Sequence, residues 1–142
     1  MGDADCGFEL RDHTADIALF AWGTTPDKLF AAAATGLYAA IGELHGTGHK
    51  LPATTNLQGR DQVTLLVDFL SELLFKFETA HVWMVDPRFE ELTETHLRMT
   101  GLFEPLDVNR CQYDREVKAV THHNLAIRPM PGRLETTIIL DI

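Results

Sequence analysis

Hydrophobic residues recur along this chain with two periods, and the two periods predict different elements. Where apolar and polar residues alternate, the pattern predicts strands, over residues 7–12, 16–22, 54–59, 82–91, 96–103, 116–127 and 134–142. Where apolar residues recur every three or four positions, the pattern predicts two helices. The first runs from Thr25 and Pro26 to about Gly42, and the second from Asp61 to about Glu78.

The connections between the predicted strands determine the expected pairing. Turn signals stand at Asp86-Pro87, at Pro105 to Asn109 and at Pro129 to Gly132. Connections of hairpin length join antiparallel strands. We therefore expect one α+β domain over residues 1–142, with two layers in which two helices pack on a mostly antiparallel sheet.

The final strand carries the first sign of chemistry. Residues 136–142 are apolar or β-branched except for Asp141, and a single apolar residue, Ile142, follows it. We expect the chain to end inside the fold, with the Asp141 side chain and the α-carboxylate of Ile142 side by side at the end of a strand. Two negative charges so close favour a bound cation or a cluster of donors. The ending therefore resembles half of an oxygen-ligand site.

The segment from Asp12 through His13 to Asp16 is the candidate for the other half, because Asp12 ends one predicted strand and Asp16 begins the next. A purely structural role stays open, since Asp at turns also bonds its own backbone. If the last strand lies antiparallel beside the strand opened by Asp16, then Asp16, Asp141 and Ile142 supply three hard oxygen donors. Such donors suit Ca²⁺, Mg²⁺ or Mn²⁺.

Lys118 lies in the apolar part of the predicted strand 116–127. A lysine near the carboxylates can bridge them or contact a phosphate as a compact positive charge. The alternative is a lysine that faces outward from an exposed strand, and the sequence leaves both interpretations open.

The charge of the chain limits the kinds of molecule that it can bind directly. The formal net charge is -9, and no cluster of Lys and Arg occurs, which argues against binding nucleic acid directly. Any RNA is then reached only indirectly, through a partner protein. Cys6 and Cys111 belong to no CxxC motif, the acidic start lacks a signal-peptide pattern, and no apolar run is long enough for a membrane helix. We expect a soluble, cytoplasmic protein.

Familiar catalytic motifs are missing from the chain: it has no GxSxG, no HExxH, and no arrangement that would activate a nucleophile. We therefore expect no stand-alone catalysis. A metal-dependent hydrolase would need a general base beside the metal, and the sequence offers no obvious one.

Several motifs together resemble the archease family. They are His13-Thr14-Ala15-Asp16-Ile17, the helical stretches from Leu29 to Leu37 and from Leu65 to Thr79, Glu116-Val117-Lys118-Ala119-Val120-Thr121, and the closing Leu140-Asp141-Ile142. They occur in order over nearly the whole chain, and their combination is specific although each alone is not.

The resemblance implies an accessory protein for an RtcB-type RNA ligase, a 3'-phosphate ligase that acts in tRNA splicing and RNA repair. Members of this family are understood to promote guanylylation and multiple turnover of that ligase. The family's calcium site maps by motif onto Asp16, Asp141 and Ile142, and Lys118 matches a position of functional importance. A non-catalytic chaperone or scaffold with a structural ion is the alternative. Metal identity and oligomeric state stay open.

Overall fold

The computed structural model describes residues 5–12 and 15–142. Within these residues the chain forms two helices and ten strands. They are β1 (Cys6–Asp12), β2 (Asp16–Gly23), α1 (Pro26–Ile41), β3 (Gly42–Glu43), β4 (Leu51–Gln58), α2 (Gln62–Ala80), β5 (Val82–Leu92), β6 (His96–Pro105), β7 (Gln112–Tyr113), β8 (Ala119–Val120), β9 (Ile127–Met130) and β10 (Arg133–Asp141).

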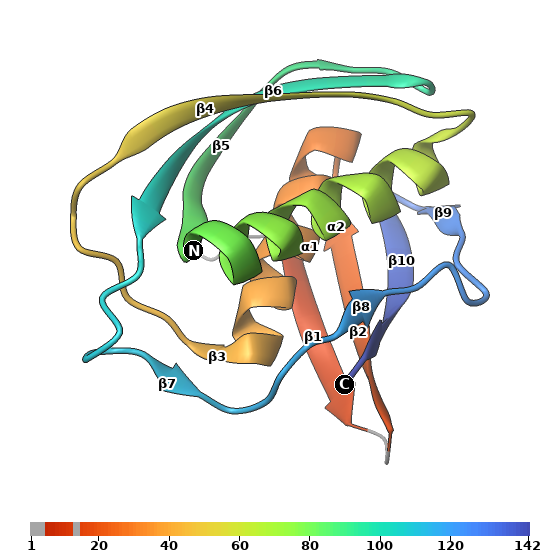
Figure 1. Ribbon diagram of the computed structural model, residues 1–142. Helices are drawn as coiled ribbons and strands as arrows, with labels where there is room; N and C mark the ends of the chain where they lie inside the picture. The colour runs from red at the N-terminus through yellow and green to blue at the C-terminus, as the bar shows by residue number, and fades with distance from the viewer. Residues whose placement is uncertain (1–4, 13–14) are drawn as a thin grey trace.

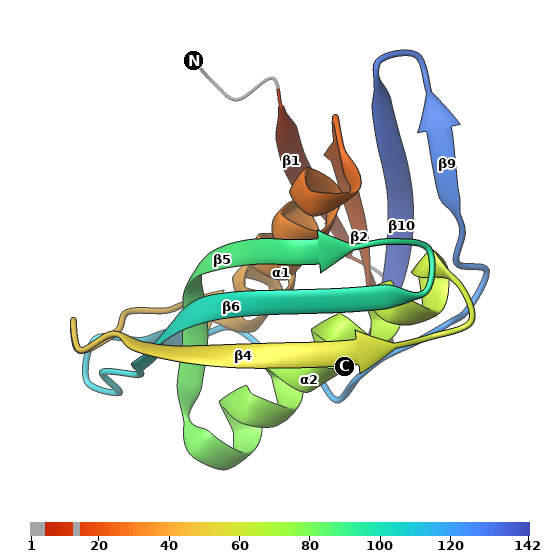
Figure 2. The ribbon, with the colours of Figure 1, turned by 90° about the horizontal axis from the view of Figure 1, so that it is seen from above.

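The strands pair in an antiparallel sense throughout the described residues. One sheet has the order β1-β2-β10-β8 with β9 also on β10, a second has the order β4-β6-β5, and β3 pairs with β7. The predicted α+β class, with two helices on a mostly antiparallel sheet, is confirmed. The structure adds that the helices pack between the two larger sheets: α1 contacts β1, β2 and β5, and α2 contacts β4, β5, β6 and β8 (Figures 1 and 2).

Helix α1 lies close to the first sheet because its inner face is made of small residues. Thr25 caps the helix by accepting a hydrogen bond from the backbone N–H of Lys28, and Pro26 occupies the first turn. At Gly36 a Cβ atom would collide with the Leu19 side chain on β2 unless that side chain moved. The glycine therefore lets the helix cross this strand closely.

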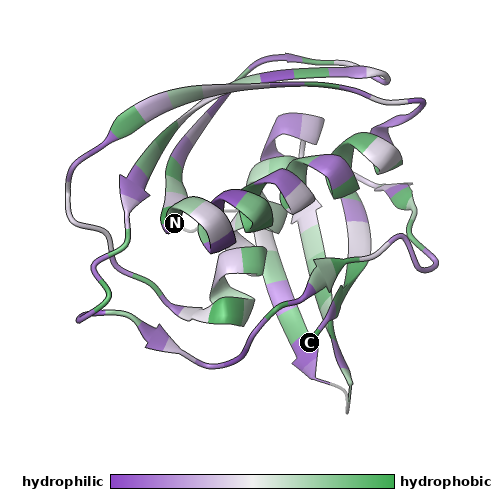
Figure 3. Ribbon diagram, in the orientation of Figure 1, coloured by the Kyte–Doolittle hydropathy of each residue, from purple (hydrophilic) through white to green (hydrophobic). Residues whose placement is uncertain are grey.

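Helix α2 joins the two sheets through a wide apolar face (Figure 3). Asp61 caps it by accepting a hydrogen bond of 2.8 Å from the backbone N–H of Thr64, and this bond lowers the pKa of the Asp61 carboxyl. Phe69 is fully buried, with its ring 5.8 Å from that of Phe30 on α1 and 5.7 Å from that of Phe89 on β5. These three rings connect both helices to the second sheet.

The prediction of a single strand over residues 116–127 is wrong. The structure has only the two-residue strand β8 before a turn, and then β9. The hydroxyl of Thr121 accepts a hydrogen bond from the backbone N–H of His123, and Asn124 adopts a left-handed conformation with φ 51°. Polar side chains that bond nearby backbone compete with strand pairing, and Asn tolerates this conformation. Local hydrogen bonding therefore overrides the apolar alternation.

The Asp86-Pro87 pair also departs from expectation, because it lies within β5 and not in a turn. Strand β5 is at the edge of its sheet, where a proline costs no ladder hydrogen bond. The pairing of β5 with β6 shifts register between Met84 and Asp86 and again between Phe89 and Glu91. This edge is therefore irregular along its length.

Two further observations concern the cysteines and the helices. Cys6 and Cys111 are both free thiols. Of the helices in the described ranges, neither combines the length and the apolar character needed to cross a membrane.

Candidate functional site

The predicted convergence of Asp16 and Asp141 is present in the strand register. Asp16 opens β2, Asp141 closes β10, and the two residues are direct partners in the antiparallel pair. Directly opposed residues project from the same face of a sheet, with Cβ atoms about 4.5–5.5 Å apart. In Figure 1 the C-terminal end of β10 lies near β8, with which it pairs on the side opposite β2. The two carboxylates thus lie side by side at one end of the sheet.

The alternation of buried residues determines which face carries them. Ile17 and Leu140, the neighbours of Asp16 and Asp141, are direct partners and are buried on the helix side. Asp16 and Asp141 therefore project from the opposite, outer face, where Asp16 is half-buried and Asp141 is exposed.

Asp12 does not join this pair. It is opposite Ile17 in the β1–β2 register, so its side chain projects from the helix side of the sheet. There its carboxylate lies 3.9 Å from the guanidinium of Arg115. His13, the other candidate in this segment, lies outside the described residues.

Among the described residues, neither Asp16 nor Asp141 forms a salt bridge. Arg11, on the same face, instead pairs with Glu9 at 2.8 Å and lies over the ring of Phe20. Like charges directly opposite one another destabilise a strand pair. A bound cation would offset that repulsion.

Lys118 lies next to this pair through its backbone. Its N–H donates a hydrogen bond of 2.7 Å to the carbonyl oxygen of Asp141, just before Ala119 pairs with the same residue in β8. The Lys118 side chain is exposed, as expected for a lysine that faces outward from the sheet. Its backbone lies beside that of Asp141, as expected for a lysine near the carboxylates.

The described residues supply only part of a site for a hard cation. Within residues 5–12 and 15–142, no group of three or more His, Cys, Asp and Glu side chains is placed to hold a metal. Asp16 and Asp141 supply two carboxylates, and Ile142, which is half-buried against the core, follows directly. Ca²⁺ takes six to eight oxygens, and Mg²⁺ is commonly held by one or two carboxylates together with phosphate oxygens. These residues therefore fit an ion that shares its remaining positions with water or a partner.

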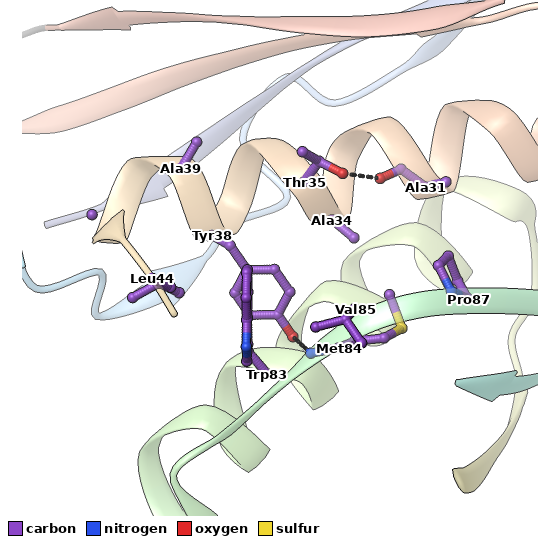
Figure 4. A pocket seen from close by; sticks show the side chains of 11 residues that line it. Ala31, Ala34, Thr35, Tyr38, Ala39, Leu44, Trp83, Met84, Val85 and Pro87 are labelled. Atoms are coloured by element: carbon purple, nitrogen blue, oxygen red, sulfur yellow. Dashed lines mark hydrogen bonds between the residues drawn. The ribbon is translucent and has the colours of Figure 1, made fainter. Parts of the chain in front are cut away.

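A cavity of about 360 Å³ lies elsewhere, between α1 and β5 (Figure 4). Its walls are mostly apolar, and Tyr38 accepts a hydrogen bond of 3.0 Å from the backbone N–H of Met84. Burial raises the pKa of the Tyr38 hydroxyl, so it stays protonated at physiological pH. Trp83 Nε1 is buried there without a hydrogen-bond partner among the described residues. The lining offers no carboxylate, imidazole or thiol.

A second cavity, of about 320 Å³, lies between the end of α2 and the segment leading to β8. We refer to it as the α2 cavity; its lining includes Leu74, Phe77, Glu78, Tyr113, Asp114 and Glu116. The sequence patterns did not single out Tyr113, because it lies in the two-residue strand β7, too short to show a period. Desolvation raises the pKa of its hydroxyl.

Nearly the whole chain resembles known proteins. Residues 8–142 match the model of the archease protein family (MTH1598/TM1083). The chain is 32% identical to the archease of Methanopyrus kandleri over 138 residues, which cover 95% of this chain and 99% of that protein. It is also 32% identical to the archease of Methanosarcina barkeri over 139 residues, with 95% of each chain covered.

Two solved structures share the fold. The solution structure of protein 1598 of Methanobacterium thermoautotrophicum matches with a TM-score of 0.75 and 27% identity, over 96% of this chain and 99% of that one. The crystal structure of an archease, possible chaperone, from Thermotoga maritima matches with a TM-score of 0.69 and 17% identity, over 94% of this chain and 96% of that one.

Proposed function

The chain belongs to the archease family, and from that premise we propose that it activates an RtcB-type 3'-phosphate RNA ligase in tRNA splicing and RNA repair. In this role it promotes guanylylation and multiple turnover of the ligase and is no enzyme by itself. The observation that supports this proposal is the direct pairing of Asp16 with Asp141 beside Lys118, on the outer face of a sheet. A site on an open face can be presented to another protein.

The chemistry of nucleotidyl transfer explains why such a site is useful to a ligase. Phosphoryl and nucleotidyl transfer depend on positioning and on neutralising phosphate charge. A divalent ion, Ca²⁺ by family resemblance with Mg²⁺ or Mn²⁺ as alternatives, supplies that neutralisation when bound. Asp16, Asp141 and the α-carboxylate of Ile142 hold the ion, and Lys118 binds a phosphate oxygen directly.

The charge of the chain fits indirect contact with RNA. At a net charge of -9 the protein repels a phosphate backbone, so the ligase binds the RNA and this chain binds the ligase. We place this partnership in the cytoplasm.

A guanylylation assay tests the proposal. Purified ligase is incubated with GTP and each divalent ion in turn, with and without this protein. The rate at which the covalently guanylylated ligase forms is measured. We expect the protein to raise both the rate and the number of turnovers. No stimulation under any ion would contradict the proposal, and turnover of phosphoester substrates by the protein alone would indicate an enzyme instead.

The contribution of Ile142 is testable through its α-carboxylate. An extension after Ile142 converts that carboxylate into an amide, whereas the same extension before Met1 leaves it intact. We expect the C-terminal extension to weaken Ca²⁺ binding about tenfold, because even indirect partners of a metal contribute 10- to 100-fold to its affinity. Isothermal titration of both tagged forms measures this, and equal affinities would remove Ile142 from the site.

The alternative is a chaperone or scaffold in which the ion is only structural. The Thermotoga maritima relative is described as a possible chaperone. On this alternative, loss of the carboxylates lowers the melting temperature of the metal-loaded protein, and stimulation of the ligase falls only as far as folding does. Melting curves recorded beside the activation assay separate the two.

A further inference from the structure

We propose that the α2 cavity is the surface on which the ligase docks, and that it receives an arginine side chain of that partner. This proposal rests on the proposed function and names the contact that would hold the two proteins together. Three features of the cavity support it: its aromatic walls, its unpaired carboxylates and its connection, through the segment from Val117 to Lys118, to the backbone of Asp141.

The aromatic walls suit a planar cation. The rings of Phe77 and Tyr113 are 6.4 Å apart at an interplanar angle of 73°. Tyr113 is 50% exposed, and Phe75, three positions before Glu78 on α2, is 59% exposed. Aromatic faces attract guanidinium groups, and exposed aromatic clusters are typical anchors of protein interfaces.

The charged groups around the cavity are mostly negative. Glu78, Asp114 and Glu116 are exposed at its rim, and none of them forms a salt bridge with another described residue. Arg115 also lines the cavity, but its guanidinium donates to the carbonyl oxygen of Ala40 and lies near Asp12. The free carboxylates therefore outnumber the one cation, which is already engaged.

These charges select the class of occupant. A guanidinium can bind a carboxylate with two parallel hydrogen bonds while its plane stacks on an aromatic ring, which a lysine ammonium does not do. Phosphate groups of RNA would be repelled by the same carboxylates. An arginine of a partner protein satisfies both the aromatic and the acidic parts of the lining.

The position of the cavity explains how docking would serve activation. Val117 lines the cavity, and the next residue, Lys118, bonds through its backbone to Asp141. A partner held at the cavity therefore lies within a few residues of the proposed metal site. The cavity lies on the helix side of the first sheet and the carboxylates on its outer face, and the segment from Val117 to Lys118 connects the two.

Exposed charges can be changed here without disturbing the core. We would replace Glu78 and Glu116 together by Gln, and separately by Lys, and use Glu94→Gln, in the exposed turn between β5 and β6, as the control. We expect the Gln pair to weaken ligase binding about tenfold at low salt, and the Lys pair to weaken it further by repulsion. Glu94→Gln should leave the affinity unchanged. Isothermal titration of the ligase at several salt concentrations measures this, and the salt dependence should be smaller for the Gln pair.

The guanylylation assay separates failure of this proposal from failure of the proposed function. A docking defect raises the concentration of protein needed for half-maximal stimulation and leaves the maximum intact. If wild-type protein neither binds nor stimulates the ligase, both proposals fail. If wild-type protein binds but the Gln and Lys pairs bind equally well, only the docking surface is wrong. If the Lys pair binds no more weakly than the Gln pair, or if the variants change self-association alone, the occupant is not a basic side chain of the ligase.

Discussion

Replacing Asp16 and Asp141 together by Asn should abolish stimulation of ligase guanylylation while the protein stays folded. The substitution keeps the size of both side chains but removes the charges that face each other across β2 and β10. We expect Ca²⁺ affinity to fall by about 100-fold or more, because removing a direct ligand costs at least as much as removing an indirect partner. In metal-free buffer the variant should be no less stable than wild type, because its paired side chains no longer repel.

The matched control for this experiment is Asp12→Asn. Asp12 ends the neighbouring strand but projects from the helix side of the sheet. Its exposed ion pair with Arg115, at 3.9 Å, contributes little to stability. This variant should stimulate the ligase like wild type. Undiminished stimulation by the Asp16 and Asp141 double variant would exclude the carboxylate mechanism, and an equal loss in Asp12→Asn would show that the two faces are not functionally distinct.

Phe69→Ala should be the most destabilising of the single changes considered for this fold. The Phe69 side chain is fully buried and packs against the rings of Phe30 and Phe89, so truncation leaves a cavity where α1, α2 and the second sheet meet. Truncations of this kind cost about 3–5 kcal/mol. For a chain of this length the melting temperature should fall by on the order of 10 °C or more.

Phe75→Ala is the comparison that isolates burial. Phe75 lies on the same helix but is 59% exposed, so its removal should change the free energy of unfolding by no more than about 0.5 kcal/mol. Urea denaturation followed by circular dichroism measures both variants. Similar destabilisation by the two would mean that Phe69 does not connect the sheets as described.

Much of the fold could be predicted because local signals and burial agree. Thr25 and Asp61 each cap the helix that the apolar spacing predicts, and the side chain of each accepts the expected backbone hydrogen bond. The pairing of Asp16 with Asp141 was accessible for a similar reason: Ile17 and Leu140 need a buried face, and strand alternation then assigns their neighbours to the outer face. The metal-binding role of that pair stays a prediction.

Features that depend on contacts distant in the sequence were not predictable. The distribution of strands over sheets on both sides of the helices follows from which elements share a core, and alternation alone does not reveal this. The α2 cavity brings Tyr113 beside Phe77 across a gap of more than thirty positions in the sequence. The prediction of one strand over residues 116–127 failed for a local reason. Short polar side chains around the turn at Asn124 bond the backbone there.

The irregular edge of β5 has a consequence for how this protein meets other chains. A regular free edge is a template on which a further strand can add, and it is a common route to polymerisation. Here Pro87 offers no donor, two register shifts bend the strand, and the N–H of Met84 is already bound by Tyr38. Growth by strand addition is disfavoured along this edge even in concentrated solution. This edge of the second sheet is therefore protected by its own sequence.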